Sequence, residues 1–409
     1  MIKNPVEIQP SKLHLVWIFP GRLDYALDAA TWLKTTSELR QLGWQVTLIN
    51  SGPDGMKLIH GVEVFCINSP EVYFLRQLIF HTKLFFYLLS RQQSIQIILF
   101  NQPTAPWIFP LKLLRQFSDS KTPIFVMDTR TVPMENLWKA SLRDRLRGWF
   151  SLLMNKFGNS LADGQTAITR RMAERVQIQP SRLWGIWSSG ADLAQFSSAL
   201  KSRKWPENNG PIHITYIGVL HYERNLMSLC RAVEMANAEG MNFTLTLTGD
   251  GTQKHELEMF AHKSENHVRV NPPVPHEKVP DLLKDVHIGA LPFPDEEKYQ
   301  VSSPIKLFEY MAAGLPVLAT RIVCHTDVIN NDAFVFWAED ASPDGLLLSL
   351  RNIWNKRGTL AKMGIESNKF AQNFTWTESA KKLRDALQIG LETVSPEFQS
   401  NNIRQKPNG

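Results

Sequence analysis

The sequence Val-Ser-Ser-Pro-Ile-Lys-Leu-Phe-Glu-Tyr-Met-Ala-Ala-Gly-Leu-Pro-Val-Leu-Ala-Thr occupies residues 301–320 and predicts a loop, a short helix and a strand. Ser303 is a residue type that caps helix N-termini, and Pro304 fits the first helical position, where its missing N–H costs nothing. Gly314 suits the left-handed position that ends a helix, and a short apolar run follows Pro316. The stretch is therefore expected to form a helix–strand unit.

Lys306 and Glu309 lie three residues apart, so they share one face of the predicted helix near its N-terminus. The first turn of a helix has unpaired N–H groups and a partial positive charge, which makes it a site for phosphate. The spacing alone favours an ordinary surface Lys–Glu pair. The sequence around the pair shifts the balance toward a binding site.

All twenty residues together resemble the nucleotide-sugar loop and helix of family 4 glycosyltransferases, in the variant whose helix starts Pro-x-Lys-x-x-Glu-Tyr. In that family the helix glutamate, which matches Glu309, holds the ribose hydroxyls of the donor. The resemblance implies an α/β fold of the GT-B type: two Rossmann-like, doubly wound domains facing a central cleft, with a C-terminal helix crossing back to the first domain. It also implies a UDP-, GDP- or similar sugar as donor, retention of anomeric configuration, and no metal or other cofactor.

Composition sets broad limits on the protein class. A chain of 409 residues exceeds the size at which single cores stop growing, so two domains are expected. Its apolar fraction of 43% and charged fraction of 21% are ordinary for a soluble enzyme. The three cysteines match no metal-ligand spacing and indicate reduced thiols in a cytoplasmic protein. No signal peptide or membrane-spanning run is expected.

The first half alternates short apolar strands with helical patterns, which predicts a parallel sheet covered on both faces. Ligands of such sheets bind at the carboxyl ends of strands. Gly21 and Arg22 follow the first predicted strand, and Asp128 and Arg130 lie at the end of the last one, so the resemblance places these four residues on the acceptor side. A local ion pair between Asp128 and Arg130 is the alternative. The expected strands are 13–19, 45–50, 62–67, 95–100 and 124–127, with helices at about 26–42 and 72–91.

Residues 138–157 predict a basic amphipathic helix with Trp149 and Phe150 among its apolar residues and several Lys and Arg around the rest. Such a helix can dock on an anionic membrane surface. This predicts peripheral contact with the inner face of the membrane in addition to the cytoplasmic location. A core helix with a solvated charged face is the favoured alternative.

The second half repeats the alternation of strands and helices. Gly190, Asp192 and Phe196 resemble the Gly-x-Asp-x-x-x-Phe segment that leads into the second domain of the family, and the polar stretch 197–210 is expected to be a linker. Beyond the opening stretch, strands are expected at 212–217, 243–248, 268–270, 286–291 and 333–337. The predicted domains are 1–200 on the acceptor side, completed by a helix at 376–395, and 210–375 for the nucleotide sugar, with a disordered tail at 396–409.

Transfer from a nucleotide sugar places negative charge on the leaving diphosphate, which fixed cations or N–H donors must stabilise. Arg224 follows a strand that ends in Gly218 and lies beside the next predicted helix start. Gly249 and Gly251 end another strand and let backbone approach a ligand closely. A surface arginine and ordinary turn glycines are the alternatives for these positions.

Several positions depart from the family pattern. Val219 and Arg224 stand where many members have Arg and Lys, and Val301 replaces the first of two glutamates. Lys306 can supply the missing positive charge, since a charge-assisted contact contributes roughly 1.5–3 kcal/mol. The candidate catalytic residues are Arg224, Lys306 and Glu309, and the candidate donor-binding residues are Gly218, Gly249, Gly251, Ser302, Ser303, Pro304, Ile305 and Glu309.

The sequence thus predicts a metal-independent, retaining glycosyltransferase that moves a sugar to a glycan, a lipid-linked or another acceptor, as in polysaccharide biosynthesis. One alternative is a GT-B nucleotide-sugar epimerase. Another is a catalytically degenerate nucleotide-binding scaffold, which Val219 and Val301 support. Nucleic-acid binding is not expected, because the positive charge is spread along the chain and no aromatic–basic module is visible. No general base is assigned.

Overall fold

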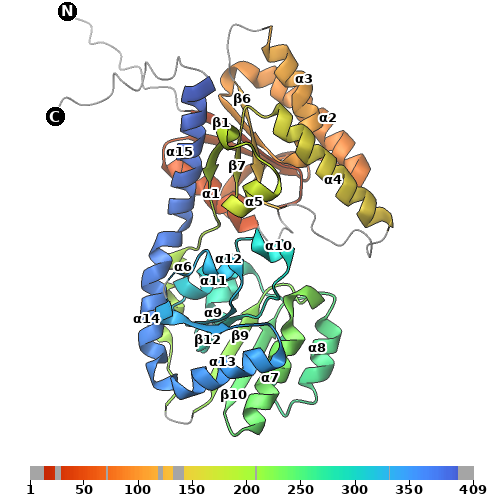
Figure 1. Ribbon diagram of the computed structural model, residues 1–409. Coiled ribbons are helices and arrows are strands. Elements are labelled where there is room, and N and C mark those ends of the chain that lie inside the picture. Colours follow the sequence, from red (N-terminus) through yellow and green to blue (C-terminus); the bar gives the residue numbers. More distant parts are fainter. Residues whose placement is uncertain are drawn as a thin grey trace, which may run out of the picture. The chain divides into compact units, whose positions relative to one another are not determined.

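The computed structural model describes residues 13–23, 29–70, 72–117, 123–131, 142–207, 210–330 and 332–394 (Figure 1). The chain divides into two compact units, one formed by Met1–Trp187 with Ser379–Gly409 and the other by Ser188–Glu378. The predicted tail at 396–409 and the start of the predicted basic helix, at 138–141, lie outside the described residues. The predicted domain limits stay a prediction.

The first unit contains an eight-stranded sheet in the order β3-β4-β2-β1-β5-β6-β7-β8. Strand β3 pairs antiparallel with β4, and the other neighbours pair in parallel. The five predicted strands are present, and β3, β7 and β8 are additions. The strands are β1 His14–Phe19, β2 Gln45–Ser51, β3 Gly55–Ile59, β4 Val62–Ile67, β5 Ile97–Phe100, β6 Ile124–Thr129, β7 Gly164–Ala167 and β8 Leu183–Ile186.

Helices cover both faces of this sheet, because successive strand residues point to opposite sides and both sides are apolar. Leu15 and Trp17 belong to the core on one face, and Val16 and Ile18 to the core on the other. The first core is completed by α1 (Ala29–Gln41) and α15 (Trp376–Val394), and the second by α2 (Tyr73–Arg91), α3 (Ala105–Arg115) and α4 (Leu142–Leu161).

Helix α15 is the C-terminal helix that the sequence predicts, and it packs on the first unit as expected. Its buried residues Leu383 and Leu387 share a core with Trp17 and Trp187. Helix α3 was not predicted, and α4 continues beyond the predicted end at 157.

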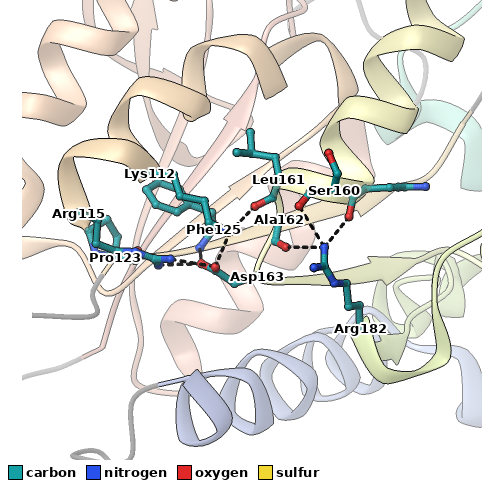
Figure 2. Close-up of polar contacts among 10 residues, drawn as sticks. Lys112, Arg115, Pro123, Phe125, Ser160, Leu161, Ala162, Asp163 and Arg182 are labelled. Carbon is teal, nitrogen blue, oxygen red and sulfur yellow. Dashed lines mark hydrogen bonds and ion pairs between the residues drawn. The ribbon is translucent and has the colours of Figure 1, made fainter. Parts of the chain in front are cut away.

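Asp163 ties α3 to the sheet (Figure 2). Its carboxylate lies 2.8 Å from Lys112 Nζ and 2.7 Å from Arg115 Nη1, and it accepts the Phe125 N–H at 2.8 Å. Burial raises the pKa of Asp163, but Arg115 and Lys112 outweigh burial and hold that pKa below its ordinary value. Two cations of α3 therefore serve the internal structure of the first unit.

The second unit contains a parallel six-stranded sheet in the order β11-β10-β9-β12-β13-β14. This is the 3-2-1-4-5-6 order of a doubly wound Rossmann sheet, whose ligands bind beyond the carboxyl ends of the strands where the order reverses, here between β9 and β12. The strands are β9 Ile212–Ile217, β10 Phe243–Thr248, β11 Val268–Asn271, β12 Ile288–Leu291, β13 Val317–Thr320 and β14 Val335–Ala338.

Helix α6 (Leu193–Ser202) occupies part of the stretch predicted as a linker. The Asp192 carboxylate caps it by accepting the Gln195 N–H at 3.1 Å, and Phe196 and Ala199 are buried. The linker prediction is therefore wrong for residues 197–202, because a short apolar stripe outweighs the polar composition. Other helices of this unit include α7 (Leu226–Ala238), α9 (Val279–Leu282), α10 (Glu297–Gln300), α11 (Ile305–Ala312), α13 (Pro343–Asn355) and α14 (Leu360–Ala371).

Candidate active site

The loop after β9 lies where the strand order of the second sheet reverses, between β9 and β12. Gly218 begins this loop with a φ of +152°, a conformation that favours glycine. The loop ends at Asn225, whose side-chain amide donates to the Pro292 carbonyl at 3.1 Å. This bond ties the loop to the segment after β12. The residues after both strands therefore lie at one edge of the sheet.

Arg224 is held in this loop by aromatic rings. Its guanidinium carbon lies 5.0 Å from the ring centre of Phe293 and 5.5 Å from that of Tyr299. The Tyr299 hydroxyl donates to the Glu223 carbonyl at 2.7 Å, which fixes the ring beside the arginine. Within the described ranges, no carboxylate pairs with Arg224. A stacked guanidinium keeps its N–H edge for an external anion.

Helix α11 is fixed to the same sheet by a tyrosine. The Tyr310 hydroxyl accepts the Ile217 N–H at 3.0 Å, and the Tyr310 ring packs so closely over Gly289 that a side chain there would collide with it. Leu307 and Met311 of this helix are completely buried. The helix is thereby locked against the ends of β9 and β12.

Glu309 lies at the centre of a charged network. Its Oε2 lies 2.8 Å from Lys306 Nζ, and its Oε1 accepts a hydrogen bond from His276 Nε2 at 2.7 Å. The Glu309 side chain is 3% exposed, whereas those of Lys306 and His276 are 26% and 35% exposed. Burial alone would raise the pKa of Glu309, but Lys306 and His276 lower it to about 2. Glu309 is therefore an ionised carboxylate held by two partly exposed partners.

Sequence reasoning missed His276, which precedes α9 and stands 33 residues before its partner. No spacing rule connects residues so far apart in the chain. The available signal was its place after β11, at the carboxyl edge where ligands of such sheets bind.

The start of α11 differs from the prediction. The helix begins at Ile305 with Pro304 as its N-cap residue, and the Ser303 hydroxyl is buried without a hydrogen-bond partner among the described residues. The prediction of Ser303 as the cap is therefore wrong. The Ser302 N–H donates to the Tyr299 carbonyl at 3.2 Å, so it belongs to the end of α10. In the described part of the chain, the N–H groups of Ser303, Ile305 and Lys306 donate to no protein acceptor.

Gly249 and Gly251 allow two loops to pack against each other. A side chain at Gly249 would collide with the Gly218 carbonyl, and one at Gly251 would collide with the Leu220 carbonyl. The Leu220 N–H also donates to the Asp250 carbonyl at 2.8 Å. The close packing of these two loops is enough to explain why Gly249 and Gly251 are glycines, and no bound ligand is needed to explain them.

The first unit has a small cavity of about 90 Å³ at the carboxyl ends of β1, β5 and β6. Asp128 and Arg130 line it together with the aromatic residues Trp17, Phe19, Trp32 and Phe100. Gly21 and Arg22 follow β1 after Pro20, and they are not among the described residues that line the cavity.

Asp128 and Arg130 are both held by Trp187. The Asp128 Oδ1 accepts the Trp187 indole N–H at 2.9 Å and the Thr166 hydroxyl at 2.7 Å. The Arg130 guanidinium carbon lies 3.8 Å from the centre of the Trp187 ring. Burial raises the pKa of Asp128, and the charge of Arg130 and the two hydrogen bonds oppose that rise only in part.

The described residues contain no group of three His, Cys, Asp or Glu residues able to hold a metal ion, and no helix long and apolar enough to cross a bilayer. The three cysteines Cys66, Cys230 and Cys324 are free and buried.

Part of this chain matches a known protein family, and the fold resembles solved structures. Residues 211–355, which contain Arg224, Lys306 and Glu309, match the family model described as glycosyl transferases group 1. No curated protein matches the chain.

Among solved structures, sucrose-phosphate synthase from Thermosynechococcus elongatus is 15% identical, with a TM-score of 0.71 over 95% of this chain and 100% of that one. HepE of Anabaena, solved with UDP-glucose, is 13% identical, with a TM-score of 0.66 over 92% of this chain and 99% of that one. A glycosyltransferase from Rickettsia africae is 13% identical, with a TM-score of 0.65 over 94% of this chain and 100% of that one.

The two Rossmann-like units, the returning helix and these likenesses define the GT-B fold. Within the second unit, residues 211–355 belong to glycosyl transferases group 1, the class also called family 4. The predicted family, fold class and enzyme class are confirmed.

Proposed function

We propose that the second unit binds a nucleotide-diphosphate sugar and that the enzyme transfers its sugar to an acceptor with retention of configuration and without a metal ion. The observation that carries this proposal is the ionised, buried Glu309, held by Lys306 and His276 beside the unpaired N–H groups that begin α11. The HepE structures in complex with UDP and with UDP-glucose support this class of donor by fold analogy.

Glu309 is proposed to hold the donor ribose. An ionised carboxylate has about four lone-pair sites, and the two bonds to Lys306 and His276 leave sites for sugar hydroxyls. His276 acts as a positioning residue, because it fixes the orientation of the carboxylate from a different element of the unit.

The leaving diphosphate is proposed to lie against the start of α11. Charge gathers on this phosphate as its bond to the anomeric carbon breaks. The Lys306 ammonium has three N–H donors and uses one on Glu309, so two remain for phosphate oxygens. The N–H groups of Ser303 and Ile305 and the stacked Arg224 add further positive potential.

The remaining donor-binding residues have indirect roles in this proposal. Gly218 begins the loop that carries Arg224, and Gly249 and Gly251 let the neighbouring loop pack beneath it. Pro304 sets the position at which α11 begins. The Ser302 N–H is not proposed to bind the donor, because it already donates to the Tyr299 carbonyl.

Asp128 and Arg130 are proposed to bind the acceptor in the aromatic cavity of the first unit, with Gly21 and Arg22 in the adjoining loop. Aromatic rings beside a carboxyl and a guanidinium suit a hydroxyl-rich ligand. A glycan or a lipid-linked sugar is the proposed acceptor, and the cytoplasm the proposed location.

A donor-hydrolysis screen over nucleotide sugars tests this function. The enzyme is expected to release nucleoside diphosphate from at least one donor, and Glu309→Gln is expected to lose that activity. A chain that neither cleaves nor binds any nucleotide sugar would instead be a degenerate scaffold.

A further inference from the structure

The first unit exposes large apolar side chains on three neighbouring helices. Thirteen of the 22 large hydrophobic residues exposed in the described part of the chain belong to α2, α3 and α4. Helix α3 packs against both α2 and α4, and the three helices lie side by side in Figure 1. We call this surface the three-helix face; it includes Leu78 and Phe86 on α2, Phe109 and Leu113 on α3, and Trp149 and Leu153 on α4.

Packing on the sheet does not explain this surface. A helix that covers a sheet needs one apolar stripe, and α2 and α3 already supply it through Phe80, Leu84 and Ile108, which are fully or almost fully buried. On the opposite side Phe86 is 63% exposed and Trp149 is 67% exposed. Exposed apolar side chains on a second side of adjacent helices are typical of a surface that contacts another protein or a membrane.

By sequence, the excess of basic over acidic residues lies in the same three helices. They contain nine Lys or Arg residues and one acidic residue, Asp144, by sequence. The whole chain has 45 basic and 39 acidic residues, so 36 basic and 38 acidic residues remain outside these helices. Lys112 and Arg115 pair with the buried Asp163, and Lys83 pairs with Asp54, so these three do not count toward the face. By sequence, six basic residues and Asp144 remain on the three helices. The charge is concentrated, so the prediction of a spread charge is wrong.

We infer that the three-helix face docks on an anionic phospholipid bilayer. Exposed Trp, Phe and Leu can enter the interface while Lys and Arg stay at the headgroups, where each contributes about 1 kcal/mol on an anionic surface. A second copy of the chain is a poor occupant, because two such faces would bring like charges together. The surface extends over α2 and α3, which the sequence-based prediction for 138–157 did not include, and the inference does not depend on the proposed reaction.

Flotation of the full chain with vesicles tests this inference. Strong binding to phosphatidylcholine–phosphatidylglycerol vesicles is expected, with weaker binding to phosphatidylcholine alone and at high salt. Two variants probe separate helices: Leu78→Asn with Phe86→Asn on α2, and Trp149→Asn with Leu153→Asn on α4. Each is expected to weaken binding by roughly tenfold or more. The matched control is Leu348→Asn with Ile365→Asn, whose residues are 62% and 63% exposed in the second unit, and it should bind like the original chain.

Three results would overturn the inference. The first is no preference for anionic vesicles. The second is loss of binding only in the α4 variant, which would reduce the surface to one helix. The third is a dimer of the original chain, seen by sedimentation, that both face variants convert to monomer. Unchanged circular dichroism and melting temperature show that the substituted chains remain folded.

Discussion

Lys306 Nζ lies 2.8 Å from Glu309 Oε2, and this contact joins a side chain that is 26% exposed to one that is 3% exposed. The lysine therefore has two roles: it stabilises a buried carboxylate and leaves N–H donors at the start of α11.

Lys306→Ala is expected to lower kcat by roughly 10²–10³-fold while donor affinity falls much less, because charge on the leaving phosphate develops mainly in the transition state. Steady-state kinetics and calorimetry measure the two effects. Lys284→Ala is the matched control, since Lys284 forms an exposed pair with Asp281 at the same three-residue spacing. An unchanged kcat in Lys306→Ala would remove this lysine from the mechanism.

His276→Ala is expected to raise the pKa of Glu309 from about 2 toward its ordinary value, because a bond to the carboxylate is lost. A depressed folded-state pKa stabilises the protein above the unfolded value of about 4.5, and this stabilisation is lost as the pH falls toward 2. Removing His276 therefore shifts acid unfolding to higher pH, as measured by circular dichroism. His276→Gln keeps an N–H donor and should restore part of the difference. Identical acid unfolding of all three chains would argue against the positioning role.

Arg224→Ala is expected to weaken binding of nucleoside diphosphates by roughly tenfold, since one charge-assisted contact to phosphate is lost. Arg224→Lys should recover part of the affinity without the aromatic stacking. Arg321→Ala provides the control, because Arg321 also stacks on a ring, that of Trp337 at 4.9 Å, but pairs with Glu339. Equal effects of the two alanine variants would mean that Arg224 contributes only packing.

Asp128→Asn is expected to stabilise the first unit more at neutral than at acidic pH. Burial raises the pKa of Asp128, so the folded state gains a proton relative to the unfolded state, and stability is lost as the pH rises through the folded-state pKa. Asparagine keeps an acceptor for Trp187 and Thr166 without the ionisation cost. Urea unfolding of both chains on either side of that pH range measures the difference. A constant difference in free energy of unfolding would contradict the raised pKa.

Much of the fold could be predicted because its signals are local. The stretch at 301–320 combines an apolar helical stripe, a left-handed glycine and a buried strand, and Gly314 has a φ of +67° as expected. Strand β3 escaped prediction because it is an edge strand whose residues are mostly exposed, so no apolar run marks it. Ser303 was predicted as the N-cap because serine often caps a helix whose first residue is proline. In the structure the helix begins one residue later, at Ile305, so Pro304 is the N-cap residue.

The site was only partly predictable because its partners come from different elements. Lys306 and Glu309 share one helix and were predicted together, whereas His276 reaches Glu309 from the segment before α9. The three-helix face was hidden for a related reason. An apolar pattern identifies α2 as a helix, but only the packing shows that side chains such as Phe86 point away from the core.

Calorimetric titration with UDP, GDP and ADP tests the central claim most directly. At least one nucleotide is expected to bind the original chain and the Lys284→Ala control at a single site, and Glu309→Ala is expected to abolish that binding. Absence of binding by all three nucleotides, or undiminished binding to Glu309→Ala, would contradict the proposal that Glu309 and the start of α11 hold the donor.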